Sequence, residues 1–242
     1  MKKVVIIVSA YNEASNIKAL YKSVVENIDR SQYDFDICFI DDGSIDNSYT
    51  IINQIKENDK KVKSYKLKKN YGHEIAMIAG VDLNIGYDYY ILMDCDLQHP
   101  PQYIMSILKE MDNGHDAVMM RRQNNNSRSA ILNLFSELYY DSFNFLFREK
   151  FVKSASDFMG FNNDIAEVLR HKYRYKNRLL RYITQKISKN KKVLEYIPVK
   201  RYSGESKYSF IKYCMLALQS VKSMSLVKHN SDLNDLYYEV EE

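Results

Sequence analysis

Short apolar runs alternate with amphipathic stretches along the first half of the chain. The runs at 4–9 (VVIIVS) and 35–40 (FDICFI) are rich in β-branched and aromatic residues, which is typical of buried strands. Residues 14–29 between them repeat apolar side chains at helical spacing. The pattern predicts strands at 4–9, 35–40, 62–67, 89–93 and 117–120, and helices at 14–29, 46–58, 73–85 and 101–111. Such alternation predicts an α/β fold, with a mostly parallel central sheet flanked by helices.

The pattern changes beyond residue 122. Residues 123–127 (QNNNS) are polar and lack periodicity, so they predict a loop. Residues 129–148 predict a helix that is apolar nearly all round, with its polar side chains in one narrow stripe. Such a helix is either buried in a core or lies in a membrane interface. Residues 206–227 predict a second largely apolar helix that carries lysines, and an acidic tail occupies 226–242.

Three polar clusters directly follow predicted strands: Ser9–Glu13 (SAYNE), Asp41–Ser44 (DDGS) and Asp94–Gln98 (DCDLQ). Because ligands of parallel sheets bind beyond the carboxyl ends of the strands, we expect these clusters to converge on one edge. An Asp-x-Asp followed by Gln offers the hard oxygen ligands that Mg²⁺ or Mn²⁺ prefers. The carboxylates of DDGS can accept hydrogen bonds from a base or ribose, and the Gly-Ser after them also suits a tight turn.

Composition and motifs exclude several classes of protein. The chain contains neither GxxxxGK[ST] nor GxGxxG, which argues against a P-loop enzyme or a dinucleotide-binding dehydrogenase. Three widely separated cysteines (Cys38, Cys95 and Cys214) favour a reducing compartment over a disulfide framework or a zinc site. The N-terminal apolar run is too short for a signal peptide. No stretch approaches about 18 uncharged apolar residues, so no transmembrane helix is expected.

Charge is distributed unevenly along the second half. Residues 170–212 carry fourteen lysines and arginines but only two glutamates, and the charged residues after Lys228 are all acidic. A basic block of this kind indicates either an anionic partner, such as phosphates, nucleic acid or a membrane surface, or a solvated helix face. A nucleic-acid-binding protein would leave the three acidic clusters at the strand ends unexplained, so we expect no nucleic-acid partner.

Several segments, in this order, are similar to the inverting family-2 glycosyltransferases with a GT-A fold: VSAYNE, FIDDGSID, NYGHEIAMIAGVD and MDCDLQHPP. Residues 156–161 (SDFMGF) resemble the "GDFRL" segment of that family. Residues 201–208 (RYSGESKY) resemble the "R-x-x-G-x-S-K-Y" signature of its polyprenyl-phosphate branch. That branch includes dolichol-phosphate mannose synthases and bacterial undecaprenyl-phosphate sugar transferases. The resemblance extends over residues 4–225.

This resemblance implies one GT-A domain over 1–225, with a Rossmann-like nucleotide-sugar-binding half (1–122) and an acceptor-binding half (123–225) that carries amphipathic helices. The implied activity is that of a metal-dependent hexosyltransferase, which moves a sugar with inversion from a UDP- or GDP-sugar to polyprenyl phosphate. Transfer to a saccharide hydroxyl in capsule or lipopolysaccharide assembly is the alternative. A catalytically inactive binding module is a further one, against which the intact Asp94-Cys95-Asp96 argues.

The resemblance also implies roles for individual residues. It assigns nucleotide-sugar binding to Tyr11, Glu13, Asp41, Asp42 and Asp94, and the metal, Mg²⁺ or Mn²⁺, to Asp94, Asp96 and Gln98. It assigns phosphate and acceptor contacts to Arg128, Arg201 and Lys207, and catalytic roles to Asp157 and Asp96. Asp157 would be a base or an orienting carboxylate. A lipid phosphate is already an anion and hardly needs a base, whereas a sugar hydroxyl would.

Some segments depart from the family pattern. Met-Met-Arg-Arg at 119–122 replaces the usual Gly-Ser-Arg, which leaves open which arginine takes that position. SDFMGF lacks the arginine after Phe158. His73 and His99 are expected to be packing or loop residues rather than ligands. We expect a cytoplasmic enzyme associated peripherally with the inner face of the cell membrane, and homo-oligomer formation is left open.

Overall fold

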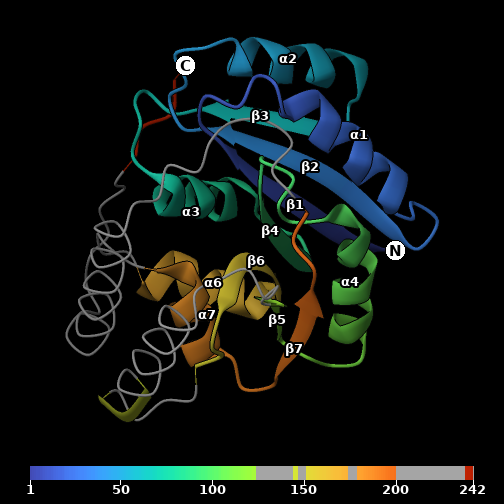
Figure 1. Ribbon diagram of the computed structural model, residues 1–242, viewed down its shortest axis with the longest axis vertical. Helices are drawn as coiled ribbons and strands as arrows, with labels where there is room; N and C mark the ends of the chain where they lie inside the picture. Colours follow the sequence, from blue (N-terminus) through green and yellow to red (C-terminus); the bar gives the residue numbers. More distant parts are fainter. Residues whose placement is uncertain (124–143, 147–150, 174–178, 200–237, 242) are drawn as a thin grey trace.

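The structure, a computed structural model, describes residues 1–123, 144–146, 151–173, 179–199 and 238–241 (Figure 1). Its strands are β1 (Lys2–Ala10), β2 (Tyr33–Asp41), β3 (Val62–Lys66), β4 (Tyr89–Asp94), β5 (Ala117–Arg122), β6 (Ala155–Asn162) and β7 (Lys191–Tyr196). They form one seven-stranded sheet in the order β3-β2-β1-β4-β6-β5-β7. Neighbours run parallel except at β6, which is antiparallel to both β4 and β5. The mostly parallel sheet is therefore confirmed.

Helices cover both faces of the sheet. They are α1 (Ile17–Asn27), α2 (Ser48–Asn58), α3 (His73–Leu83), α4 (Ile104–Asp112) after a short 3₁₀ turn (Pro101–Tyr103), α6 (Asn163–Lys172) and α7 (Leu180–Ile187). Their buried side chains place α1, α2 and α4 on one face and α3, α6 and α7 on the other (Figure 1). Among these described helices, none has the length and apolar character needed to cross a membrane.

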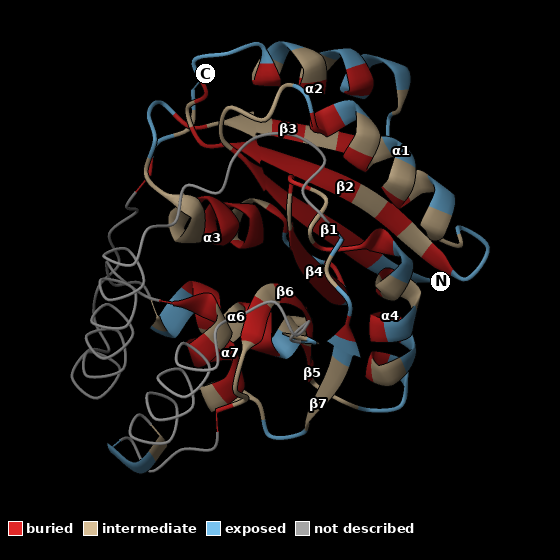
Figure 2. Cartoon of the chain, in the orientation of Figure 1, coloured by how far each residue is buried: buried red, intermediate tan, exposed pale blue. Residues whose placement is uncertain are grey.

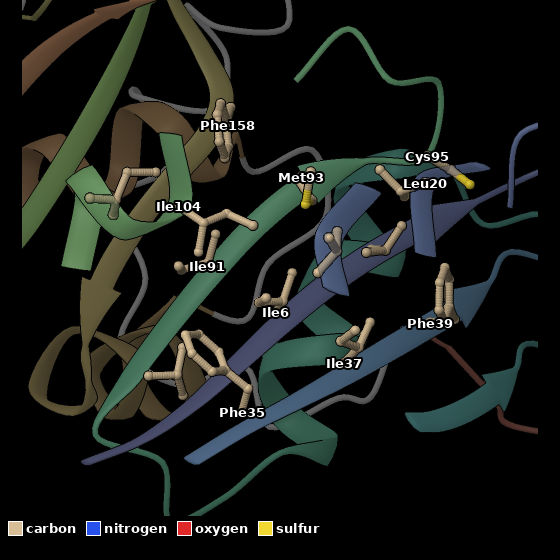
Figure 3. Close-up of a cluster of buried hydrophobic side chains, with 14 of the residues drawn as sticks. Ile6, Leu20, Phe35, Ile37, Phe39, Ile91, Met93, Cys95, Ile104 and Phe158 are labelled. Carbon is tan, nitrogen blue, oxygen red and sulfur yellow. The ribbon is translucent and has the colours of Figure 1, made fainter. Parts of the chain in front are cut away.

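Alternate residues of each buried strand pack into two hydrophobic cores, one on each face of the sheet. Ile6 of β1 packs with the α1 side, whereas Val5 and Ile7 pack with the α3 side. Figure 3 shows the first core, in which Ile6 lies near Ile37 and Ile91 from the neighbouring strands. The central strands are buried along most of their length, and exposed residues gather on the outer helix faces (Figure 2). Such continuous burial explains why these strands read as uninterrupted apolar runs.

Two glycines allow a helix on each face to approach the sheet closely. A Cβ at Gly80 of α3 would lie 2.3 Å from Cγ2 of Ile7 in β1. A Cβ at Gly160 of β6 would lie 2.4 Å from Cγ2 of Ile107 in α4. Both distances are far below van der Waals contact, so a larger residue at either position would push the helix away from the sheet.

All five strands and four helices expected over residues 4–120 are present, with bounds that differ by a few residues. The structure adds elements that the sequence pattern did not predict: SDFMGF lies within strand β6, and α6 and α7 follow it. Of the helix expected at 129–148 only 144–146 are described, and the helix expected at 206–227 lies outside the described residues.

The described end of the acidic tail pairs with the outer edge of the sheet beside β3. Val240 forms an antiparallel bridge with Leu67. The backbone N–H of Lys68 donates to the carbonyl of Glu239 at 2.9 Å, and Lys68 Nζ also lies 2.6 Å from the carboxylate of that residue. Tyr238 is buried against the α3 side of the core. These contacts cover part of an otherwise open edge.

Candidate active site

Strand register brings the three polar clusters to one edge of the sheet, as expected. Ala10 at the end of β1 pairs with Asp41 at the end of β2. Ser9 pairs with Asp94 at the end of β4. The carboxyl ends of β1, β2 and β4 therefore lie side by side, and the loops that follow them start from the same edge.

The reversed strand β6 adds a further carboxylate to this edge. Because β6 is antiparallel, its beginning lies where its neighbours end. Leu92 of β4 pairs with Met159 of β6, and continuing that register by two residues brings Asp94 opposite Asp157. The two acidic side chains thus meet across adjacent strands, although 62 residues lie between them in the sequence.

His73, at the start of α3, lies between these two carboxylates. Its Nε2 is 3.5 Å from Oδ1 of Asp94 and 3.8 Å from Oδ2 of Asp157. Its Nδ1 is hydrogen bonded at 2.9 Å to the hydroxyl of Ser9. From the other side, Nη1 of Arg181 in α7 lies 3.4 Å from Oδ2 of Asp157. A histidine and an arginine from different helices therefore face the same oxygen of Asp157.

Burial and neighbouring charges shift the pKa values of Asp157, His73 and Glu74. Burial alone would raise the pKa of Asp157, but the positive charges of Arg181 and His73 outweigh it and hold that pKa below its ordinary value. Burial likewise opposes protonation of His73, yet Asp94 and Asp157 raise its pKa overall. Next to it, Glu74 has its pKa raised to about 7 by burial and by the negative charge of Asp157.

Two carboxylate oxygens at the centre of the group accept no hydrogen bond from the described residues. Oδ1 of Asp94 and Oδ1 of Asp157 are buried and accept no hydrogen bond from the residues that the structure describes. Buried carboxylate oxygens are costly to leave without a partner. Both atoms are therefore candidates for contact with a bound ligand or ion.

His99 has the packing role expected of it. It is 1% exposed, and its ring stacks on Phe158 with centroids 5.2 Å apart. Its Nδ1 accepts the backbone N–H of Asp94 at 2.9 Å, so the ring proton resides on Nε2 and the imidazole is neutral. Burial also lowers the pKa of His99. The same expectation does not describe His73, which lies between two site carboxylates.

The loop after β4 reaches toward the end of β5. Asp96 Oδ1 accepts the backbone N–H of Gln98 at 3.0 Å, and Leu97 between them has a φ of 64°, an unfavourable value for a bulky side chain. Oε1 of Gln98 accepts a hydrogen bond from Nη2 of Arg122 at 3.2 Å. Arg121 points elsewhere and pairs with Glu195. Of the two arginines at 121–122, Arg122 is thus the one directed at the site.

Asp41 and Asp42 are almost completely buried. Both oxygens of Asp42 accept backbone N–H groups, from Tyr71 at 2.8 Å and from Gly72 at 2.9 Å. Asp41 accepts the N–H of Ser44 at 3.2 Å through one oxygen, while its other oxygen has no partner among the described residues. Burial raises the pKa of Asp42 to about 6 and that of Asp41 as well. These carboxylates hold the loops around them in place.

Hydrogen bonds tie the loop after β1 to the loop after β2. The backbone N–H of Asn12 donates to Oγ of Ser44 at 2.9 Å, and the N–H of Glu13 donates to Oγ of Ser48 at 2.8 Å. Gly43 adopts a φ of 68°, and a Cβ there would lie 2.4 Å from the backbone of Lys69. Only glycine fits at that position. Tyr11 and Glu13 are therefore carried by a loop that is fixed to the DDGS loop.

The family model for "Glycosyl transferase family 2" matches residues 5–170, which include every described site residue above except Arg181. The chain belongs to glycosyl transferase family 2. The resemblance drawn from the sequence motifs is thereby confirmed, and so is the assignment as a transferase.

Curated members of family 2 align with nearly the whole chain. It is 29% identical over 220 residues to "Putative glycosyltransferase CsbB" of Bacillus subtilis, covering 91% of this chain and 66% of that protein. It is also 29% identical over 223 residues to "Bactoprenol glucosyl transferase" of Shigella phage SfX, covering 92% and 72% respectively. The chain thus spans about two thirds of the length of these relatives.

Solved glycosyltransferases share the fold. Glucosyl-3-phosphoglycerate synthase from Mycobacterium tuberculosis, solved with Mn²⁺, UDP and phosphoglyceric acid, superposes with a TM-score of 0.67 at 11% identity, covering 99% of this chain and 86% of that one. S. aureus TarS 1-349, solved with UDP-GlcNAc, gives a TM-score of 0.61 at 16% identity, covering 97% and 68%. The expected GT-A fold is therefore confirmed.

The donor set of this family-2 chain fits a divalent cation held jointly with substrate. Asp94 and Asp96 supply carboxylates, and Oδ1 of Asp94, which accepts no hydrogen bond from the described residues, has the chemistry that such an ion requires. No group of three or more His, Cys, Asp or Glu among the described residues forms a protein-only cage. Mg²⁺ sites commonly use one or two carboxylates, with waters and phosphates completing the shell. Gln98 as a third ligand stays a prediction, since its oxygen accepts from Arg122.

The structure brings together Asp94, Asp96, Gln98 and Asp157 at one edge, with Asp41 and Asp42 at the neighbouring strand end. Arg128, Arg201 and Lys207, to which the resemblance assigns phosphate and acceptor contacts, lie outside the described residues. The motifs did not single out Glu74 or Arg181, and they left open which of Arg121 and Arg122 takes the family's arginine position. Glu74 lies inside the matched segment NYGHEIAMIAGVD, which could have drawn attention to it, whereas Arg181 was one of many cations in the basic block.

Proposed function

We propose that the chain transfers a sugar, with inversion, from a nucleotide-sugar donor to a polyprenyl phosphate in a reaction that uses a divalent cation. The observation that carries the proposal is the facing pair Asp94 and Asp157, each with a buried oxygen that accepts no hydrogen bond from the described residues. Relatives named bactoprenol glucosyl transferase support the acceptor class. Family membership supports the donor class.

The donor occupies the edge formed by β1, β2 and β4. Tyr11 and Glu13 would contact the nucleoside from a loop that Ser44 and Ser48 hold in place. Asp41 and Asp42 shape the neighbouring loop, and a direct contact with the base or ribose stays a prediction for both. A bound Mg²⁺ or Mn²⁺, held by Asp94 and Asp96, would stabilise the negative charge that develops on the departing nucleoside diphosphate.

The environment of Asp157 favours an anionic acceptor over a sugar hydroxyl. Arg181 and His73 hold the pKa of Asp157 below its ordinary value, against the effect of burial, which makes it a weak base. Removing a proton from a hydroxyl calls for a base with a pKa nearer the working pH. A phosphate is already ionised, so a carboxylate that orients groups at the reacting centre is sufficient.

Basic residues would receive the acceptor phosphate. Arg122 projects to the site and is oriented there by Tyr196 and Gln98. Arg128, Arg201 and Lys207 are assigned the same task by the sequence motifs. A guanidinium presents a planar set of donors that matches phosphate oxygens.

We further propose peripheral contact with the inner face of the cell membrane, where a polyprenyl phosphate is anchored. Phe145 and Leu146 are 88% and 61% exposed, and they lie within 129–148, the segment whose pattern left open a buried or an interfacial helix. Exposed apolar side chains of this kind bind a bilayer surface. Flotation with anionic liposomes tests this, and a protein that stays in the soluble fraction at low salt would contradict it.

Labelled UDP- and GDP-sugars, offered with polyprenyl phosphate or with saccharide acceptors, test the proposed function. We expect a sugar-linked polyprenyl phosphate that disappears when a chelator is added and returns with Mn²⁺ or Mg²⁺. Transfer to saccharides with none to the lipid would overturn the proposed acceptor. It would favour a role in capsule or lipopolysaccharide assembly instead.

A further inference from the structure

Helix α7 carries Arg181, and Glu74 of α3 contacts its first turn. The backbone N–H of Leu180, the first residue of α7, donates to Oε2 of Glu74 at 2.9 Å. The residue before it, Leu179, supplies no side-chain cap. The first N–H groups of a helix have no partner within the helix, so an acceptor oxygen at this position satisfies one of them. Glu74 thus caps α7 from a different helix.

The capped residue is directly adjacent in sequence to the arginine that faces Asp157. Arg181 follows Leu180, and its Nη1 lies 3.4 Å from Oδ2 of Asp157. Leu180 and Ile183 pack in the core on the α3 side, which fixes where the helix axis lies. The hydrogen bond that the N–H of Leu180 donates to Glu74 fixes the first turn of α7. A shift of that turn would therefore move the guanidinium of Arg181.

The first turn of α3 therefore acts on Asp157 by two routes. His73 contacts Oδ2 of Asp157 itself, and the next residue, Glu74, reaches the same oxygen through α7 and Arg181. With Oδ2 held from both sides, Oδ1 is the oxygen of Asp157 left without a described donor. This arrangement selects which oxygen is directed to a ligand.

We propose that Glu74 is a positioning residue: by accepting the N–H of Leu180 it places Arg181 against Asp157, and so orients Oδ1 of Asp157 toward the reacting sugar and acceptor. This rests on the proposed function only in that Asp157 serves the transfer reaction. The role is one of geometry, so it depends on the reach of the Glu74 side chain and not on its charge.

Two conservative variants separate reach from charge. Glu74→Gln keeps the length and an acceptor oxygen but loses the charge, whereas Glu74→Asp keeps the charge but is one methylene too short to reach Leu180. We expect Glu74→Gln to retain kcat within about 3-fold and Glu74→Asp to lose about 10-fold or more, with the KM for the donor within about 2-fold in both. If Glu74→Asp is active and Glu74→Gln is not, the charge matters and the positioning role is wrong.

A double-mutant cycle tests the route through Arg181. If Glu74 acts through that arginine, Glu74→Asp should lower kcat little further in an Arg181→Met background. Losses that multiply would mean that the two residues act independently, which would overturn the proposal. Glu110→Ala is a matched control, because Glu110 is also a partly buried helical glutamate in contact with another element through Lys192, but at the far end of the sheet. It should leave kcat unchanged.

Amide hydrogen exchange gives a readout that is independent of the acceptor. Exchange over residues 180–183 should be faster in Glu74→Asp than in Glu74→Gln or the wild type, and equal rates would overturn the proposal. The kinetic series is run on transfer to polyprenyl phosphate and on hydrolysis of the donor. Hydrolysis without transfer to the lipid would overturn the proposed acceptor but not the role of Glu74. The Glu74 variants would then be ranked by their rates of donor hydrolysis.

Discussion

Asp42 and Asp157 are both buried carboxylates at the same edge of the sheet, yet the protein holds them differently. Asp42 accepts two backbone N–H groups, whose positions are set by the fold. Asp157 faces the side chains of His73 and Arg181, and keeps one oxygen without a described donor. A carboxylate whose two oxygens both accept backbone N–H groups maintains a loop. A carboxylate contacted by side chains from two helices, with one oxygen that accepts no hydrogen bond from the described residues, is available to a ligand.

The pKa values of the two groups diverge for the same reason. Backbone dipoles do not offset the burial of Asp42, whose pKa is raised to about 6. Full positive charges do offset the burial of Asp157, whose pKa is lowered. Proximity to the site therefore does not by itself identify a reactive carboxylate, but the kind of donor beside it does.

The largest effect is expected at Asp94, the partner of Asp157 across the strands. Asp94→Asn, or a chelator added to the wild type, should lower transfer by roughly 1,000-fold or more, since a bound cation contributes several kcal/mol to stabilising the leaving group. The melting temperature without ligand should change little. Full turnover in excess chelator would contradict the proposed cation.

A smaller loss is expected at Asp157. Asp157→Asn should lower kcat by about 100-fold, because the amide cannot attract Arg181 and His73 and loses its orientation. The KM for the donor should stay close to that of the wild type. Steady-state kinetics at several donor concentrations separate the two constants, and a loss confined to KM would place Asp157 in donor binding instead.

Asp42→Asn should act mainly on stability. The amide has a single acceptor oxygen, so the N–H of Tyr71 or of Gly72 would be left facing another donor, at a penalty of about 1–3 kcal/mol. Chemical denaturation measures this penalty. We expect kcat to be nearly unchanged, and a loss in kcat comparable to that of Asp157→Asn would remove the distinction between the two carboxylates.

The last effect concerns pH. Because the pKa of Asp42 is higher in the folded state, about 6 against 3.8, the native protein binds the extra proton over that range. The contribution of Asp42 to stability therefore falls as pH rises from 3.8 to about 6. The stability difference between the wild type and Asp42→Asn should be larger at pH 4 than at pH 7. A difference that grows with pH would show that the sign is wrong.

The convergence of Asp41 and Asp94 was predictable from the sequence, because each follows a buried run and parallel strands end at a common edge. The place of Asp157 was not. SDFMGF carried a family resemblance but no alternation that identifies a strand, and nothing local indicates that β6 inserts in reverse between β4 and β5. Arg181 and Glu74 meet through the docking of α7, which depends on tertiary packing and leaves no periodic signal.

The insertion of β6 also determines the order in which the sheet can be assembled. The strands β3, β2, β1 and β4 are complete once residue 94 has been synthesised, and they can pair with one another at once. β5 follows soon after, but its sheet neighbours are β6 and β7, so it has no strand to pair with until residues 155–162 have left the ribosome. Pulse-labelled hydrogen exchange during refolding should protect the amides of β5 no earlier than those of β6. Until then the edge of β4 that will pair with β6 stays open, and Asp94 at that edge lacks its neighbour Asp157.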